Sequence, residues 1–270
     1  MYEVDEIQNQ EIENQNENLN CNFSVNFWKG DGTICVIEDQ KIETEGKIVD
    51  NELDERVNYF EIVETQKVEF LPESLAKSFP NLIEYKAMNC VIKNVSDKIF
   101  EDLYELLLLN LKGNEIAAIA IDAFKDLGKL EFLDLSDNQI RFIDPELFEP
   151  LSSLELLTLS QNKIELLSDE TFESLRSLQE IFLKDNQLVK IAVNLFKNNQ
   201  KLKWISLTNN KLKIIPSKVF ERLTQLNTVH LQGNICVDRR YSRISNPYTE
   251  PFGFSQMKRE LKMNCSRERK

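Results

Sequence analysis

The sequence has little of what catalytic and metal-binding sites are built from. It contains one histidine, His230, and seven glycines among 270 residues. It has no C-x-x-C pair, no H-E-x-x-H segment and no G-x-x-x-x-G-K-[ST] loop, which removes the common zinc, redox and phosphate-binding motifs. The abundant carboxylates are scattered and form no recognisable catalytic pair. We therefore expect a non-enzyme with no cofactor and no metal site.

Long apolar runs are also missing. No stretch approaches the roughly 18 apolar residues of a membrane span, and no apolar segment of the secretory-signal type follows Met1. Residues 1–20 are acidic and rich in Asn, Gln and Glu, so we expect a disordered tail there.

The charge is unevenly distributed. The formal net charge is −12, with 15 acidic and 4 basic side chains in residues 1–56 but 9 basic and 4 acidic in residues 238–270. Most of the surface would repel phosphates, so nucleic acid is not expected as a main partner. The basic end is interpreted as a solvated cap and tail in preference to a docking patch for an anionic partner.

What the chain does have is a period of 24 residues. Each repeat reads L-x-x-L-x-L-x-x-N-x-I-x-x-I, followed five residues later by phenylalanine, and a looser copy begins near Val57. The regular copies begin at Leu82, Leu106, Leu130, Leu154, Leu178, Leu202 and Leu226. Their phenylalanines are Phe100, Phe124, Phe148, Phe172, Phe196 and Phe220. A fixed period of this length predicts a solenoid of stacked coils.

Each repeat can be interpreted physically. The L-x-L segment alternates with period two, which predicts a short strand with its leucines inward, and stacked coils bury those leucines in one core. After the strand the chain turns sharply, and an inward asparagine amide offers both a donor and an acceptor to the buried backbone. The predicted ladder comprises Asn114, Asn138, Asn162, Asn186, Asn210 and Asn234, with Cys90 in the first regular copy. Asn199 replaces a core leucine, so its coil is expected to be the loosest.

This pattern resembles the leucine-rich repeat family, in its 24-residue extracellular form, over residues 57–236. The resemblance implies an α/β solenoid: a horseshoe with a parallel β-sheet on its concave face. The cap elements are similar to those of insect secreted leucine-rich repeat proteins and Toll-type ectodomains, although the paired C-x-C elements of the usual flanking domains are missing. Those relatives imply extracellular protein recognition, in immunity or in cell contact.

Four segments are expected. Residues 1–20 form the acidic tail, 21–56 an N-terminal cap, 57–235 about eight coils, and 236–270 a C-terminal cap and basic tail. The N-terminal cap alternates apolar residues around a Gly-Asp-Gly turn, which predicts a β-hairpin. A simple register over that turn places Trp28 or Asn26 beside Cys35.

The resemblance also implies disulfides that seal the two ends of the core. The expected pairs are Cys21 with Cys35 and Cys236 with Cys265, leaving Cys90 free. The first pair requires the chain before Phe23 to fold back. Three glycosylation sequons, at Asn22, Asn94 and Asn264, are compatible with secretion. The absent signal leaves open a mature fragment, a truncated gene model, or a cytosolic protein with reduced thiols.

Function is expected on the concave face, where residues flanking the inward leucines point outward. Apolar residues recur there, with His230 as a surface contact residue and not as a general base. The predicted partner-binding residues are Leu108, Phe132, Asp134, Leu156, Phe182, Trp204 and His230. Strand propensity alone is the competing explanation of this apolar row, and a small-molecule pocket is not expected on a smooth sheet.

The main hypothesis is therefore an extracellular module that recognises an unidentified protein ligand or receptor. The alternatives are a structural or adhesive extracellular protein and an intracellular scaffold. Homodimer formation is left open, because no sequence feature indicates an interface.

Overall fold

The structure is a computed structural model that describes residues 22–25, 33–37, 57–62, 68–73, 75–243 and 253–266, with backbone only for the first two ranges. The expected acidic tail and Cys21 lie outside the described residues. Within the described part of the chain, no helix combines the length and the apolar content needed to cross a bilayer.

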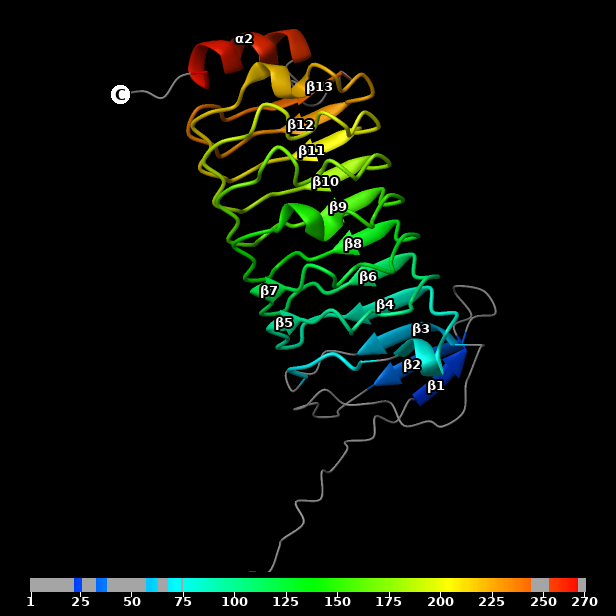
Figure 1. Ribbon diagram of the computed structural model, residues 1–270. Coiled ribbons are helices and arrows are strands. Elements are labelled where there is room, and N and C mark those ends of the chain that lie inside the picture. The colour runs from blue at the N-terminus through cyan, green and yellow to red at the C-terminus, as the bar shows by residue number, and fades with distance from the viewer. Residues whose placement is uncertain are drawn as a thin grey trace, which may run out of the picture.

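The chain winds into stacked coils that each contribute a short strand to one 11-stranded sheet (Figure 1). Its parallel strands are β2 (Thr33–Ile37), β3 (Val57–Ile62), β4 (Glu84–Ala87), β6 (Leu108–Asn110), β8 (Phe132–Asp134), β9 (Leu156–Thr158), β10 (Glu180–Phe182), β11 (Trp204–Ser206) and β12 (Thr228–His230). From β4 to β12, paired residues are 24 positions apart, as in Leu109, Leu133 and Leu157. The predicted solenoid and its parallel sheet are confirmed.

The sides away from this sheet hold short elements. They are α1 (Leu75–Ser78), β5 (Asn94–Val95), β7 (Ala118–Ile119), and the 3-10 helices η1 (Pro145–Phe148) and η2 (Ser217–Phe220). β5 and β7 form a separate parallel pair. η1 begins after Asp144, whose carboxylate accepts the backbone N–H of Glu146 at 3.0 Å, and proline occupies its first position.

Leucines and phenylalanines fill the interior of the stack. The inward strand residues Leu109, Leu133 and Leu157 are fully buried. The rings of Phe148 and Phe172 lie 6.2 Å apart between centroids, and those of Phe172 and Phe196 lie 6.1 Å apart and nearly parallel. One coil could not bury such a face alone, so the core exists only because the coils stack.

The asparagine ladder joins each coil to its neighbours. Nδ2 of Asn138 donates to the carbonyl of Leu135 in its own coil at 3.1 Å and to that of Leu111 in the preceding coil at 3.0 Å. Its Oδ1 accepts the backbone N–H of Ile116 at 2.9 Å. The same arrangement recurs at Asn114, Asn162, Asn186, Asn210 and Asn234. The predicted role of the buried amides is confirmed.

Two coils depart from the pattern. Cys90 is buried and takes no part in the described disulfide, as predicted, and its thiol donates to the carbonyl of Met88 at 3.5 Å. Asn199 is fully buried and its Nδ2 donates to the carbonyls of Phe172 and Leu175, both at 2.8 Å. Its Oδ1 has no hydrogen-bond partner among the described residues. The amide N–H groups of Asn199 therefore bond to the preceding coil, whereas burial of its amide oxygen without a described partner costs folding free energy.

The predicted N-terminal hairpin is present, but its register differs from the prediction. β1 (Asn22–Val25) runs antiparallel to β2 and places Phe23, not Trp28 or Asn26, opposite Cys35. β2 also pairs in parallel with β3, which places Cys35 beside Phe60. Pairing with β3 sets the position of β2, so the register predicted from the Gly-Asp-Gly turn alone was wrong. The proposed partner of Cys35, Cys21, is outside the described residues.

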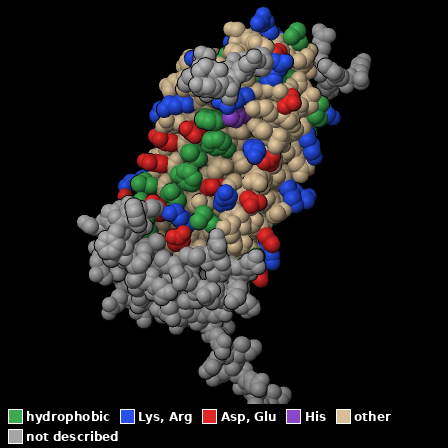
Figure 2. Space-filling model, turned by 180° about the vertical axis from the view of Figure 1, so that it is seen from behind, with side chains coloured by type: hydrophobic (Ala, Val, Ile, Leu, Met, Phe, Trp, Pro, Cys, Tyr) green, Lys and Arg blue, Asp and Glu red, His purple; other side chains and the backbone are tan. Residues whose placement is uncertain are grey.

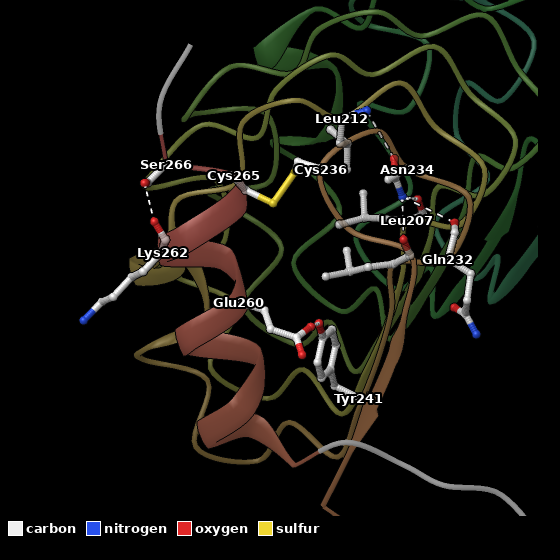
Figure 3. Close-up of a disulfide and its surroundings, with 11 residues drawn as sticks. Leu207, Leu212, Gln232, Asn234, Cys236, Tyr241, Glu260, Lys262, Cys265 and Ser266 are labelled. Atoms are coloured by element: carbon white, nitrogen blue, oxygen red, sulfur yellow. Dashed lines mark hydrogen bonds between the residues drawn. A yellow bond between two sulfur atoms is a disulfide. The ribbon is translucent and has the colours of Figure 1, made fainter. Parts of the chain in front are cut away.

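The C-terminal cap closes the other end of the core (Figure 3). β13 (Arg240–Ser242) runs antiparallel to β12, and α2 (Phe254–Asn264) covers the last coil, with Leu261 fully buried. The predicted disulfide between Cys236 and Cys265 is present, with a Cα–Cα distance of 5.2 Å. The hydroxyl of Tyr241 donates to Glu260 of α2 at 2.5 Å.

Candidate partner-binding face

The short parallel strands turn their middle residue into the core and their flanking residues outward. In β8, Leu133 is fully buried whereas Phe132 is partly exposed. We call the outward side of β4 to β13 the sheet face; it is the face on which the sequence predicts partner binding. Figure 2 shows hydrophobic side chains gathered in a band that leads away from the single histidine.

Three neighbouring strands form the first part of that band. Leu108, Phe132 and Leu156 occupy the same register position on β6, β8 and β9, and all three are partly exposed. Adjacent strands lie about 4.8 Å apart, so these side chains form a continuous row. Glu180 takes the same position on β10 and ends the row.

The second part is an aromatic cluster of Phe182, Trp204 and His230. The rings of Phe182 and Trp204 lie 6.1 Å apart at 48°, and those of Trp204 and His230 lie 5.3 Å apart at 70°. Trp204 pairs in register with Glu180 and with Thr228, so both ring contacts run diagonally across the strands. The structure therefore brings together three of the four predicted aromatic site residues at one end of the sheet face, whereas Phe132 lies in the apolar row.

Polar atoms beside this cluster are buried without hydrogen-bond partners in the described part of the chain. They are Nε1 of Trp204, Nε2 of His230, Oε1 of Gln232 and Nε of Arg240. Burial, and secondarily the charge of Arg240, lowers the pKa of His230 below its ordinary value of 6.5. A buried unpaired polar atom costs about 1–3 kcal/mol, so these atoms lower the stability of the free chain at this end of the sheet face.

Sequence reasoning missed Arg240. β13 extends the sheet by one antiparallel strand and sets Arg240 directly opposite His230. The signal was the sequence Arg240, Tyr241, Ser242, in which a fully buried tyrosine stands between two polar residues. That alternation is typical of an edge strand.

Asp134 lies on the predicted face, but its carboxylate bonds to a neighbouring residue of its own coil. It is only 9% exposed, and its Oδ1 accepts the backbone N–H of Ser136 at 2.8 Å and the Ser136 hydroxyl at 2.6 Å. At the other end of the face, Lys86 and Glu84 form an ion pair at 2.8 Å. Asp134, Glu84 and Lys86 are thus engaged within the chain.

The predicted glycosylation sites are well separated. Asn94 is exposed in β5, away from the sheet face, and Asn264 is exposed at the end of α2 beside the disulfide residue Cys265. Asn22 lies in β1, where only the backbone is described.

Comparisons with known proteins agree with this architecture. The model of the family described as leucine rich repeat matches residues 88–140, 133–188 and 176–235, which together span more than half of the chain. A sequence search of curated proteins finds no match.

Solved structures show the same similarity. A complex of TLR13 with ssRNA13 is 26% identical, with a TM-score of 0.63 over 66% of this chain and 25% of that chain. The glycosylated Toll–Spatzle complex from Drosophila, described as a hub in development and innate immunity, is 26% identical, with a TM-score of 0.60 over 66% of this chain and 24% of that chain. The chain thus spans about a quarter of the length of these structures. With its 24-residue coils, parallel sheet and matching family model, the chain belongs to the leucine-rich repeat family.

Proposed function

We propose that this chain is a non-catalytic extracellular recognition module that binds a protein partner through its sheet face. The observation that carries the proposal is the aromatic cluster of Phe182, Trp204 and His230, which is partly exposed and bordered by unpaired polar atoms. Aromatic side chains are enriched where interface energy concentrates, and polar groups around them fix the orientation of the partner.

The extracellular part of the proposal rests on two supports. The disulfide Cys236–Cys265 is of a kind that persists in oxidising compartments. The similar Drosophila structure is Toll in complex with Spatzle, a hub in development and innate immunity. Recognition in immunity or in cell contact is the role that fits both.

A protein partner is favoured over nucleic acid, although one similar structure is a complex with RNA. The sheet face carries Glu84 and Glu180 among its outward residues, and Lys86 is paired with Glu84. Single-stranded nucleic acid sites combine stacking aromatics with a positively charged groove. The aromatics are present here, with Arg240 opposite His230, but the same face carries the carboxylates of Glu84 and Glu180, which disfavour a phosphate backbone.

The test is capture of a protein partner from extracellular fluid of the source organism. Trp204→Ala and Phe132→Ala should each weaken binding by about 30-fold, the effect of losing an interface hot spot of about 2 kcal/mol. Phe142→Ala is the matched control, because Phe142 is 72% exposed but lies outside the strands of the sheet.

Two outcomes would overturn the proposal. Binding that survives both sheet-face substitutions would remove the sheet face as the site. Loss confined to Phe142→Ala would move the site to another side of the solenoid. Weak binding that is insensitive to all three substitutions would favour the structural or adhesive alternative.

A further inference from the structure

On the sides away from the main sheet, the coils that begin at Leu106 and Leu130 share fewer described backbone hydrogen bonds than the two coils before them. The coils beginning at Leu82 and Leu106 are tied there by backbone bonds from Ala117 to Lys93 and from Ala120 to Val95, both at 2.9 Å. Between the next two coils, the described backbone bonding on this side ends with Gln139 to Ile116 at 2.9 Å. Beyond that bond, no backbone hydrogen bond joins these two coils on this side among the described residues, and they meet there through side-chain packing.

The phenylalanine stack is interrupted between the same coils. Phe100 and Phe124 have ring centroids 6.2 Å apart, and Phe148 and Phe172 do so again. Among the described residues no ring contact joins Phe124 to Phe148, which ends the 3-10 helix η1. A cavity of about 350 Å³ opens at this gap, and its lining includes Ala118, Leu147 and Phe148.

The lining of this cavity is apolar apart from one carboxylate. Ile121 and Phe142 stand in it, 42% and 72% exposed, and Asp144 is its single charged residue. One carboxylate oxygen of Asp144 accepts the backbone N–H of Glu146. No ion pair to Asp144 forms within the described part of the chain.

We propose that the cavity between the Leu106 and Leu130 coils binds an aliphatic ammonium compound, with its chain against Phe148 and Leu147 and its cationic head at Asp144. The volume falls within the range of about 300–1,000 Å³ typical of small-molecule sites. An aliphatic chain laid against these partly exposed apolar side chains would remove their surface from water, at a gain in free energy. The single carboxylate selects a cation and disfavours a fatty acid, whose head carries the same charge as Asp144.

The proposal is tested with three probes that share one tail: decylammonium, decanol and decanoate, each below its micelle concentration. Isothermal titration calorimetry on the full chain should give one site. Decylammonium should bind about fivefold more tightly than decanol, because an exposed ion pair contributes at most about 1 kcal/mol to the binding free energy. Decanoate should bind more weakly than either.

Variants then locate the site. Ala118→Trp fills the mouth and should reduce decylammonium binding by at least about tenfold. Leu166→Trp is the matched control, because Leu166 occupies the position of Ala118 two repeats later and does not line the cavity. Ile121→Trp serves as a second filling variant if Ala118→Trp fails to fold. Asp144→Asn keeps a residue able to cap η1 and should abolish the preference for decylammonium over decanol.

Each other outcome overturns the proposal. Absence of binding, or binding that both filling variants leave intact, removes the cavity as the site. Equal affinity for decylammonium and decanoate would show that Asp144 does not select the ligand. Binding lost in Trp204→Ala but kept in Ala118→Trp would place the probe on the sheet face. None of these results depends on whether the sheet face binds a protein.

Discussion

The imidazole of His230 meets the indole of Trp204 nearly edge to face, with ring centroids 5.3 Å apart. Edge-to-face pairs of this kind add about 0.5–1.5 kcal/mol beyond simple burial. The contact fixes both rings on the sheet face, so a partner would meet a preformed surface there. A preformed surface lowers the cost of ordering side chains on binding.

The pKa of His230 is predicted to lie below 6.5, first because the ring is buried and second because Arg240 faces it. Since His230 is the only histidine, its ring protons give an unambiguous NMR titration. Arg240→Gln should move the pKa upward but leave it below 6.5, because burial remains. A wild-type value at or above 6.5 would contradict this environment.

The same shift gives stability a pH dependence. The unfolded chain takes up a proton at His230 at higher pH than the folded chain does, so the free energy of unfolding should fall as pH drops from about 6.5 through the folded pKa. His230→Gln removes this contribution. Urea unfolding of both proteins between pH 7.5 and pH 5 would measure it. Parallel pH dependences in the two proteins would argue against the linkage.

Asn138→Ala should destabilise the solenoid by about 2–4 kcal/mol, because the buried N–H of Ile116 loses its acceptor and a gap forms between coils. Asn194→Ala is the control: Asn194 is exposed and its side-chain Nδ2 donates to the carboxylate of Asp169 at 3.3 Å, so a cost of about 1 kcal/mol or less is expected. Chemical denaturation measures both. Equal costs would show that the ladder contributes no more than surface hydrogen bonds.

Asn199→Leu should stabilise the protein by about 1 kcal/mol, since it removes a buried unpaired oxygen and restores the repeat pattern. The carbonyls that lose the amide keep their backbone donors, Leu175 N–H to Phe172 and Leu178 N–H to Leu175. Asn198→Leu, at the partly exposed neighbouring position, should bring no gain. A lower melting temperature for Asn199→Leu would mean that its two amide bonds outweigh the unpaired oxygen.

Replacing Cys236 and Cys265 together by alanine should cost about 2–4 kcal/mol, because the bridge closes a loop of 29 residues. The loss should appear first as faster proteolysis near α2, whose Cys265 carbonyl also accepts the N–H of Ile215 at 3.1 Å. The Cys90→Ala variant controls for thiol loss in the core. Unchanged cleavage of α2 would show that Met257 and Leu261 hold the cap without the bridge.

The periodic part of the fold could be predicted from sequence because the same residue types recur at the same positions of each repeat. The inward leucines, the amide ladder at Asn138 and its equivalents, and the outward position of Phe132 and Trp204 follow from spacing alone. The C-terminal disulfide was predicted through the family resemblance, which places bridges at the ends of the core.

What could not be predicted depends on contacts between coils. The hairpin register was wrong because β3, and not the local turn, positions Cys35. The repeat pattern places Asp134 on the outward side of its strand, but its carboxylate accepts hydrogen bonds from Ser136 in the same coil. Arg240 and the cavity beside Phe148 arise where the repeat ends or the stacking is interrupted, and a consensus pattern carries no information there.

The most direct test of the central claim is hydrogen–deuterium exchange of the chain alone and bound to its captured protein partner. We predict that binding protects the backbone of β8 to β12, with the largest change around Trp204 and His230, and leaves residues 141–143 and 165–167 unchanged. Protection confined to residues 141–143 and 165–167, with β8 to β12 unaffected, would contradict recognition through the sheet face.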